Sequence, residues 1–242
     1  MKVGVLCEFS GIVRDAFLKR GHDAISCDLL GTESPGPHIK GDLFDQDWSG
    51  FDLLIMHPTC TYLCVSGLHW NKRRPERAEK TEDALLFVQR MMEIQVSRYA
   101  LENPIGCIST RIRKPDQVVQ PWWFGDDASK ATCLWLKNLP LLKPTNEIHH
   151  PAWIPCECCD DYWCVLHRKH VLECRCQDID SWTRRGLWPY AQGGYYANQT
   201  PSGQNKLGPS ATRWMDRSRT YQGLAEAMAD QWGSLLRSAE HG

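Results

Sequence analysis

The chain has 242 residues and a formal net charge of −1. That length is sufficient for one full hydrophobic core, and the near-neutral charge excludes a globally basic protein, so a nucleic acid would have to be held by local patches. No apolar run has the length of a membrane span or the layout of a signal segment, and we expect a cytoplasmic protein without a membrane partner.

The N-terminal segment has the pattern of a β-loop-α-β unit. Residues 2–7 form an apolar run that predicts a strand, residues 12–20 have apolar side chains at helical spacing, and residues 24–27 predict a second strand. Gly11 stands where the strand turns into the helix, and Asp28 closes the second strand. Backbone amides and a carboxylate in these places suit a nucleotide-containing cofactor, whereas an ordinary βαβ turn is the alternative.

A loop rich in Gly, Pro and Ser follows, and Asp42 then ends a third short strand, where it suits either an adenine amino group or a turn. Residues 51–56 form an apolar run typical of a buried parallel strand, and Pro58 ends it. Cys60 is therefore expected at the carboxyl end of a strand, where open α/β sheets bind ligands. A cysteine there is a candidate nucleophile, and a buried small apolar side chain is the alternative.

Two charged or acidic segments follow this loop. The stretch KRRPERAEK at 72–80 suits either a solvated helix face or phosphate binding. The apolar spacing over 81–99 predicts a helix.

Glu102 comes at the next strand end, before Asn103-Pro104, and is a candidate acid in the same crevice. Basic residues and the aromatic run PWWFGD at 121–126 suit nucleic-acid contact or a buried core.

The composition changes abruptly after residue 150. Six of the twelve cysteines lie within 156–176, together with two histidines. Without a signal segment, this density favours reduced thiols and a structural Zn²⁺ site over disulfides. The Cys-x2-His and Cys-x-Cys spacings can supply tetrahedral ligands, although eight candidates leave the set open. The predicted ligands are Cys164, His167, His170, Cys174 and Cys176.

The remaining pattern completes a four-part division of the chain. Residues 1–150 are expected to form the catalytic core, and residues 151–185 the Cys/His-rich segment. Residues 186–210, rich in Gly, Gln, Asn and Tyr, are predicted to be a long loop. Residues 211–242 contain an amphipathic helix that is expected to pack back on the core.

The order and spacing of the motifs through residue 104 resemble the C5-cytosine DNA methyltransferases, especially compact phage-type members. Phe9-Ser10-Gly11 resembles their cofactor loop, Pro58-Thr59-Cys60 their Pro-Pro-Cys loop, and Glu102-Asn103-Pro104 their Glu-Asn-Val motif. Thr59 replaces the second proline. Residues 109–113 match the family's Gln-x-Arg-x-Arg only in part, and the chain is short for a full target-recognition domain.

This resemblance implies a Rossmann-like α/β methyltransferase sheet that binds S-adenosylmethionine and DNA, here with the small Cys/His-rich zinc-binding insertion. It implies that Cys60 adds to C6 of cytosine, that Glu102 holds N3 and the exocyclic amine, and that Arg111 and Arg113 contact DNA. The implied cofactor-binding residues are Phe9, Ser10, Gly11, Asp28, Asp42, Leu43 and Pro58. The alternatives are an inactive DNA-binding protein on the same scaffold, or a base-modifying enzyme acting on another nucleic acid or nucleotide.

Overall fold

A computed structural model describes most of the chain. The described residues are 1–126, 128, 130–145, 153–155, 162–164, 169–170, 210 and 212–235. The chain divides into two compact units, and each is treated by itself. The first unit comprises 1–118, 132–143 and 218–242, and the second comprises 119–131 and 144–217. The predicted division at residues 150, 185 and 210 remains a prediction.

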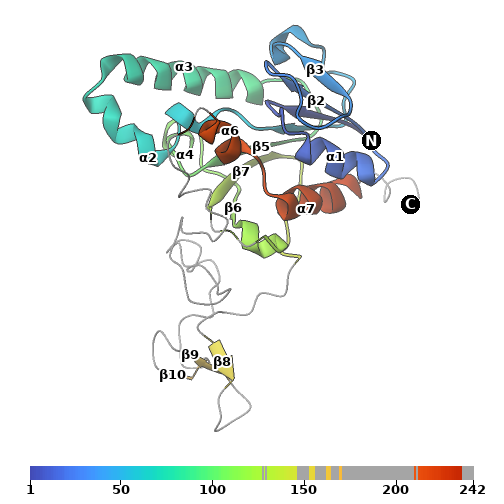
Figure 1. The fold of residues 1–242 in the computed structure, drawn as a ribbon, viewed down its shortest axis with the longest axis vertical. Coiled ribbons are helices and arrows are strands. Elements are labelled where there is room, and N and C mark those ends of the chain that lie inside the picture. The colour runs from blue at the N-terminus through green and yellow to red at the C-terminus, as the bar shows by residue number, and fades with distance from the viewer. Residues whose placement is uncertain are drawn as a thin grey trace. The chain divides into compact units, whose positions relative to one another are not determined.

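A seven-stranded sheet of order β3-β2-β1-β4-β5-β7-β6 forms the centre of the first unit (Figure 1). The strands from β3 to β5 run parallel, and β7 runs antiparallel to β5. This mixed α/β sheet is consistent with a Rossmann-like methyltransferase fold. The strands are β1 (Lys2–Leu6), β2 (Asp23–Asp28), β3 (His38–Lys40), β4 (Leu53–Met56), β5 (Tyr99–Pro104), β6 (Gln117–Val119) and β7 (Thr132–Lys137).

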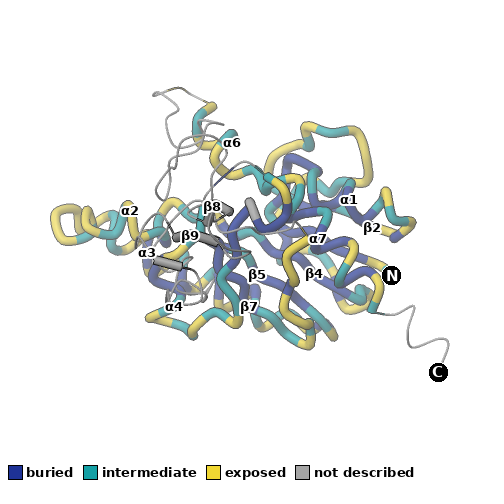
Figure 2. The backbone as a smooth tube through the Cα atoms, turned by 90° about the horizontal axis from the view of Figure 1, so that it is seen from below, coloured by how far each residue is buried: buried dark blue, intermediate teal, exposed yellow. Residues whose placement is uncertain are grey.

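The central strands are apolar because both faces of the sheet are covered. All four residues of β4 are buried, as are the last four of β1, which explains why these strands are continuous apolar runs without polar alternation (Figure 2). The strand order reverses between β1 and β4, because the chain goes first to β2 and β3 and then returns. Open α/β sheets bind ligands at the carboxyl ends of the strands beside such a reversal.

Helices and short 3-10 turns connect the strands of this unit. The α-helices are α1 (Ile12–Lys19), α2 (Val65–Leu68), α3 (Pro75–Met92), α4 (Ile108–Arg111) and α7 (Gln222–Gly233). The 3-10 turns are η1 (Leu43–Asp45), η2 (Cys60–Tyr62) and η3 (His69–Lys72). Helices α1 and α7 lie side by side and are linked by an ion pair between Arg20 and Asp230 (Figure 1). The last helix is therefore part of the same unit as the first strands.

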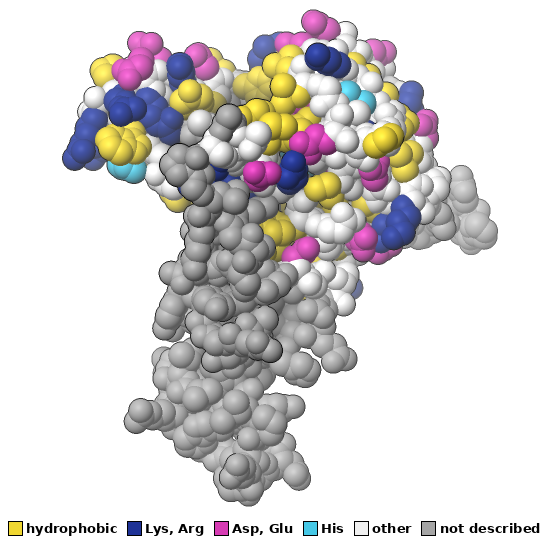
Figure 3. Space-filling view, in the orientation of Figure 1, with side chains coloured by type: hydrophobic (Ala, Val, Ile, Leu, Met, Phe, Trp, Pro, Cys, Tyr) yellow, Lys and Arg dark blue, Asp and Glu magenta, His cyan; other side chains and the backbone are white. Residues whose placement is uncertain are grey.

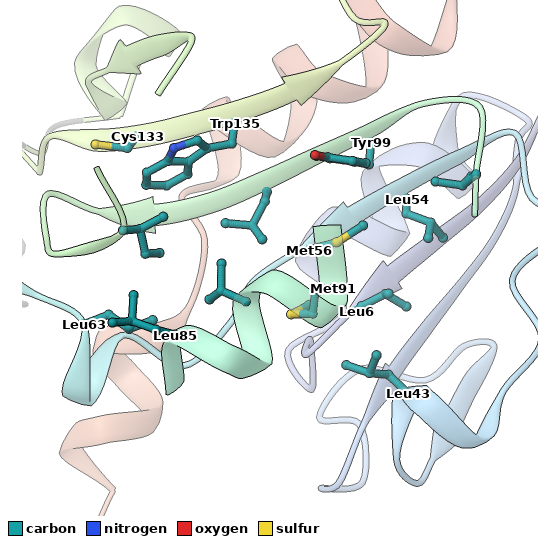
Figure 4. Packing of buried hydrophobic residues seen from close by; sticks show 14 of the residues in the cluster. Leu6, Leu43, Leu54, Met56, Leu63, Leu85, Met91, Tyr99, Cys133 and Trp135 are labelled. Atoms are coloured by element: carbon teal, nitrogen blue, oxygen red, sulfur yellow. The ribbon is translucent and has the colours of Figure 1, made fainter. Parts of the chain in front are cut away.

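Helix α3 packs its apolar face on the sheet. Its Met91 lies near Leu6 of β1 and Met56 of β4 in one hydrophobic cluster (Figure 4). All three side chains are fully buried, and burying a side chain of this size contributes about 1.5–3 kcal/mol. This cluster fixes the carboxyl ends of β1 and β4 relative to each other.

The helix predicted over 81–99 has different bounds in the structure. It begins at Pro75, which is favourable in a first turn because a proline there lacks only an amide that would have no helical partner. It ends at Met92, and Val96 is buried in the turn that leads into β5. The helical spacing of apolar residues extends beyond Met92 because Val96, although it lies outside the helix, is buried in the same core.

The second unit has fewer described elements. It contains the 3-10 turn η4 (Pro121–Phe124), most of α6 (Arg213–Ser218), and an antiparallel sheet of β8 (Trp153–Pro155), β9 (Tyr162–Cys164) and β10 (Lys169–His170). The predicted zinc ligands lie outside the described residues, except for the backbone of Cys164 and His170. Among the side chains that are described, no three His, Cys, Asp or Glu residues are placed to hold a metal ion. None of the described helices has the length and apolar character needed to cross a bilayer.

Candidate functional site

The Cys60 loop and the Glu102 segment meet at the carboxyl ends of β4 and β5. These neighbouring strands are parallel, and Met56, the last residue of β4, pairs with Leu101, so the Cys60 loop leaves the sheet beside the last residues of β5, Glu102 to Pro104. Asn103 is 1% exposed, and its side-chain Nδ2 donates a hydrogen bond of 2.6 Å to the carbonyl oxygen of Pro58. This bond ties the two predicted motifs directly to each other.

A second contact joins the same two segments. His57 Nδ1 lies 3.2 Å from Glu102 Oε2, and the side chains are 9% and 16% exposed. The other ring nitrogen of His57, Nε2, is buried and has no hydrogen-bond partner among the described residues. Buried polar atoms are nearly always satisfied, so this nitrogen marks a place where a bound group would complete the site.

The chain after Cys60 is fastened to the chain after Glu102. The backbone amide of Cys107 donates to Leu63 O at 2.9 Å, and Cys64 forms an isolated antiparallel bridge with Gly106. A Cβ added at Gly106 would lie 2.0 Å from Leu63 O, so only glycine allows this approach. The loop that presents Cys60 is therefore held in place from both sides.

A buried glutamate occupies the start of α1. Glu8 is 4% exposed, and its carboxylate accepts the backbone amides of Val13 at 2.7 Å and Arg14 at 3.2 Å. Gly11 precedes the helix in the left-handed region, at φ 77°, and supplies no side-chain cap. The backbone amides of Val13 and Arg14 therefore already have an acceptor in Glu8. Burial raises the pKa of Glu8, while His57 and the two amides lower it.

The side chain of Arg14 organises the loop after β2. It is fully buried and pairs with Asp15 at 2.8 Å. Its guanidinium also donates to Ser26 Oγ at 3.2 Å, Thr32 Oγ1 at 3.2 Å and the carbonyl oxygen of Ser34 at 3.0 Å. A buried charge needs this many partners, and the result is a fixed loop beside Asp28.

The two predicted cofactor acids lie near each other at the ends of β2 and β3. Asp28 Oδ1 accepts the amide of Leu30 at 2.9 Å, and Asp42 Oδ1 accepts the amide of Phe44 at 2.9 Å, which caps η1. Burial raises the pKa of Asp28, and the Leu30 amide opposes it. The pKa of the Cys7 thiol is raised by burial first and then by Asp28, with Asp42 contributing.

The other predicted cofactor residues mainly support the site. Leu43 and Phe9 are 5% and 6% exposed, and Leu43 belongs to the hydrophobic cluster. Ser10 Oγ lies 3.4 Å from Glu8 Oε1, and Pro58 is the acceptor for Asn103. Leu29, the neighbour of Asp28, is 71% exposed.

Cationic and aromatic side chains gather on residues 69–80, which we call the basic arm. Arg73 and Arg74 lie over the ring of Trp70, at 5.8 Å and 5.1 Å, and Trp70 is 39% exposed. Arg77 and Lys80 lie over the ring of Tyr62, at 4.9 Å and 5.7 Å. Figure 3 shows this gathering of Lys and Arg at the end of the molecule that carries α2 and the start of α3.

The basic arm is fastened to the Cys60 loop. Arg77 donates to the carbonyl oxygens of Thr61 at 2.8 Å and Gly67 at 3.1 Å, and Thr81 Oγ1 donates to Tyr62 O at 3.1 Å. The arm and the loop are thus parts of one local structure. A polyanion bound on the arm would lie next to the Cys60 loop.

The arginines that sequence reasoning chose for DNA contact have protein partners. Arg111 makes a two-point pair with Glu82, at 3.1 Å and 2.8 Å. Arg113 pairs with Asp116 at 2.8 Å and donates to Leu136 O at 3.1 Å. The pKa of each guanidinium is raised, chiefly by its carboxylate partner. The structure places both in ion pairs rather than in the basic arm.

Sequence reasoning missed Glu8, His57 and Arg14. The first two flank residues that it did select, since Glu8 precedes Phe9 and His57 precedes Pro58. A polar residue directly at the end of a predicted buried strand is the signal that could have indicated them.

No family model matches the chain, and no curated protein matches it. It is similar to a solved structure from E. coli described as a candidate DNA modification methyltransferase encoded within a prophage. The two are 13% identical with a TM-score of 0.38, over 62% of this chain and 52% of that chain. The chain thus spans about half of that protein's length. The residues of the present chain therefore have to indicate its function.

Proposed function

We propose that the protein transfers a methyl group from S-adenosylmethionine to C5 of cytosine in DNA, with Cys60 as the nucleophile. The observation that carries this proposal is the hydrogen bond between Asn103 and the Pro58 carbonyl. It joins the segment that presents a thiol to the segment that presents Glu102, at the sheet edge where ligands bind. Thiol addition and base recognition require these two groups side by side.

The acidic edge of the sheet fits this cofactor. Glu8, Asp28, Asp42 and Glu102 all follow or end strands of the parallel part of the sheet. Glu8 takes two of the α1 amides that a phosphate group would otherwise use. An edge with several carboxylates and an occupied helix start disfavours a phosphate-bearing cofactor and favours one with a positive sulfonium. Asp28, beside exposed Leu29, suits a ribose next to a flat base.

The chemistry assigned to the protein is activation of the base. C5 of cytosine is a weak nucleophile until a thiolate adds at C6, and Cys60 makes this bond. Glu102 binds N3 and the exocyclic amine, which fixes the ring and lets it accept electron density. The cofactor supplies the methyl group for C5. Loss of the C5 proton and departure of the Cys60 thiolate then restore the aromatic ring.

DNA, rather than a free nucleotide, is favoured by the basic arm. A base inside a duplex cannot reach Cys60 and has to be flipped out of the stack. Phosphate binding by Arg73 and Arg74 and stacking on the exposed Trp70 would hold such a distorted strand next to the loop. A free nucleotide has no extended backbone that would need this surface.

A covalent trap tests the proposal. DNA containing 5-fluorocytosine cannot lose the C5 substituent as a proton, so the adduct with the enzyme persists. We expect a denaturation-resistant complex that requires S-adenosylmethionine and is absent in Cys60→Ser. Cys64→Ser is the matched control, because Cys64 lies four residues away in the same pinned segment, and it should retain the complex. A complex that survives Cys60→Ser, or none with the wild-type protein, would refute the mechanism.

A further inference from the structure

Three titratable side chains follow three neighbouring strands of the sheet. Glu8 comes after β1, His57 comes after β4, and Glu102 lies on β5. His57 is the central member, since its backbone amide donates to Leu6 O at 2.9 Å and its Nδ1 lies 3.2 Å from Glu102 Oε2. The mechanism proposed above uses Glu102 but gives no role to the other two.

The geometry points to His57 as a positioning residue that shares one proton with Glu102 and so keeps Glu102 able to donate to the target base. This inference rests on the proposed function, because it names the source of a proton that cytosine recognition needs. It depends on the direct contact between the two side chains and on the burial of both.

The requirement for a proton follows from the base. N3 of cytosine is a hydrogen-bond acceptor, so a carboxylate alone would repel it and a carboxyl group has to donate. A glutamate that is accessible to water loses its proton near its ordinary pKa of about 4.3, far below neutral pH. The imidazole of His57 is in direct contact with this carboxyl group, and a ring nitrogen of histidine can carry a proton and pass it on.

The proton transfer balances without any other reactant. The one shared proton passes from Nδ1 of the His57 imidazolium to the Glu102 carboxylate, and the carboxyl group formed in this way gives it to N3, which leaves His57 neutral and Glu102 ionised. The Nδ1–Oε2 distance of 3.2 Å already allows the first transfer. When the base leaves, N3 returns the proton to Glu102 and the pair is restored. Nδ1 of His57 contacts Glu102, and the buried Nε2 of His57 can therefore bind a group of the ligand.

The surrounding groups support a shared proton. Glu8 faces His57 from the turn after β1, and burial raises the pKa of Glu8 while His57 lowers it. Cys133 of β7 faces Glu102, and burial together with Glu102 raises the pKa of its thiol to about 11, so it stays neutral. Cys60 follows His57 on the same loop.

The test compares His57→Gln with the wild type. Glutamine can still hydrogen-bond to Glu102 but cannot carry the proton. We expect the alkaline side of the kcat profile for methyl transfer to move to lower pH, with a loss of at least about tenfold at pH 8. KM for DNA and for the cofactor should change less than twofold. His57→Gln in a Glu102→Gln background should cost nothing further, because His57 acts through Glu102.

A second readout does not depend on activity. The infrared band of the Glu102 carboxyl group is identified by its absence in Glu102→Gln. In His57→Gln this band should disappear at a lower pH than in the wild type, because Glu102 no longer shares a proton with an imidazole. An unchanged band, or a kcat profile within twofold of the wild type, would overturn the inference. If the band moved in His57→Gln but the wild-type protein transferred no methyl group, proton sharing would be upheld and the proposed function would be rejected.

Discussion

The double substitution Arg73→Gln with Arg74→Gln tests the DNA-binding surface most directly. Both guanidinium groups lie over Trp70, and no ion pair is recorded for either in the described part of the chain. Their charge is thus available to phosphate groups. Neither residue holds the fold together in the way that Arg77 does, through its hydrogen bonds to the Cys60 loop.

The expected effect follows from counterion release. Each phosphate contact contributes about 0.9 to the slope of log K against log salt on duplex DNA. Losing two contacts should therefore reduce the slope by about 1.8. Between 50 and 200 mM salt, a fourfold change, the wild type should lose about tenfold more affinity than the variant.

Fluorescence anisotropy of a labelled duplex across this salt range measures the slope. Arg111→Gln is the matched control, since its charge is already paired with Glu82, and its slope should stay within about 0.3 of the wild type. If Arg111→Gln reduced the slope as much as the double variant, the ion pair would not persist on DNA. If the double variant kept the wild-type slope, the basic arm would not be the phosphate-binding surface.

Two further predictions concern buried charges. Arg14→Met should lower the free energy of unfolding by about 3 kcal/mol or more, because the Asp15 carboxylate and several loop carbonyl oxygens lose their donor. Urea titrations measure this loss. A loss below about 1 kcal/mol would contradict the role given to Arg14. Glu8→Gln should gain stability relative to the wild type as pH rises from 5 to 8. The raised pKa of Glu8 means that the folded state binds more protons than the unfolded state, so wild-type stability declines as pH rises through this range. If the free energies of unfolding of the two proteins changed with pH in parallel, this reasoning would be refuted.

Local sequence patterns were sufficient for the main strands and the two central motifs. Leu53–Met56 is apolar throughout and is followed at once by a proline, so the end of β4 and the position of Cys60 could both be predicted. Glu102 could be predicted because its strand is also punctuated by proline. In a parallel sheet, two such strand ends lie at one edge whatever the details of the loops.

Charged residues with distant partners could not be predicted in the same way. Arg14 lies in a helix with an amphipathic pattern, where an arginine is usually exposed. It is buried because the loop at Thr32–Ser34 folds over it, and no helical periodicity reports that loop. Arg111 was predicted to contact DNA from the partial match of residues 109–113 to a family motif, whereas its partner Glu82 lies 29 residues earlier in α3.

The backbone of Thr59 bears on the departure from the Pro-Pro-Cys pattern. Thr59 has φ −55° and ψ 121°, which is the extended conformation that proline also adopts. It is exposed, and its side chain makes no cap to η2. The loop can therefore keep its conformation without the second proline. The hydrogen bond from Asn103 to Pro58 and the close packing of Gly106 against Leu63 fix the loop instead. Contacts between the two motifs, rather than the stiffness of the loop itself, hold the Cys60 loop against the segment that carries Glu102.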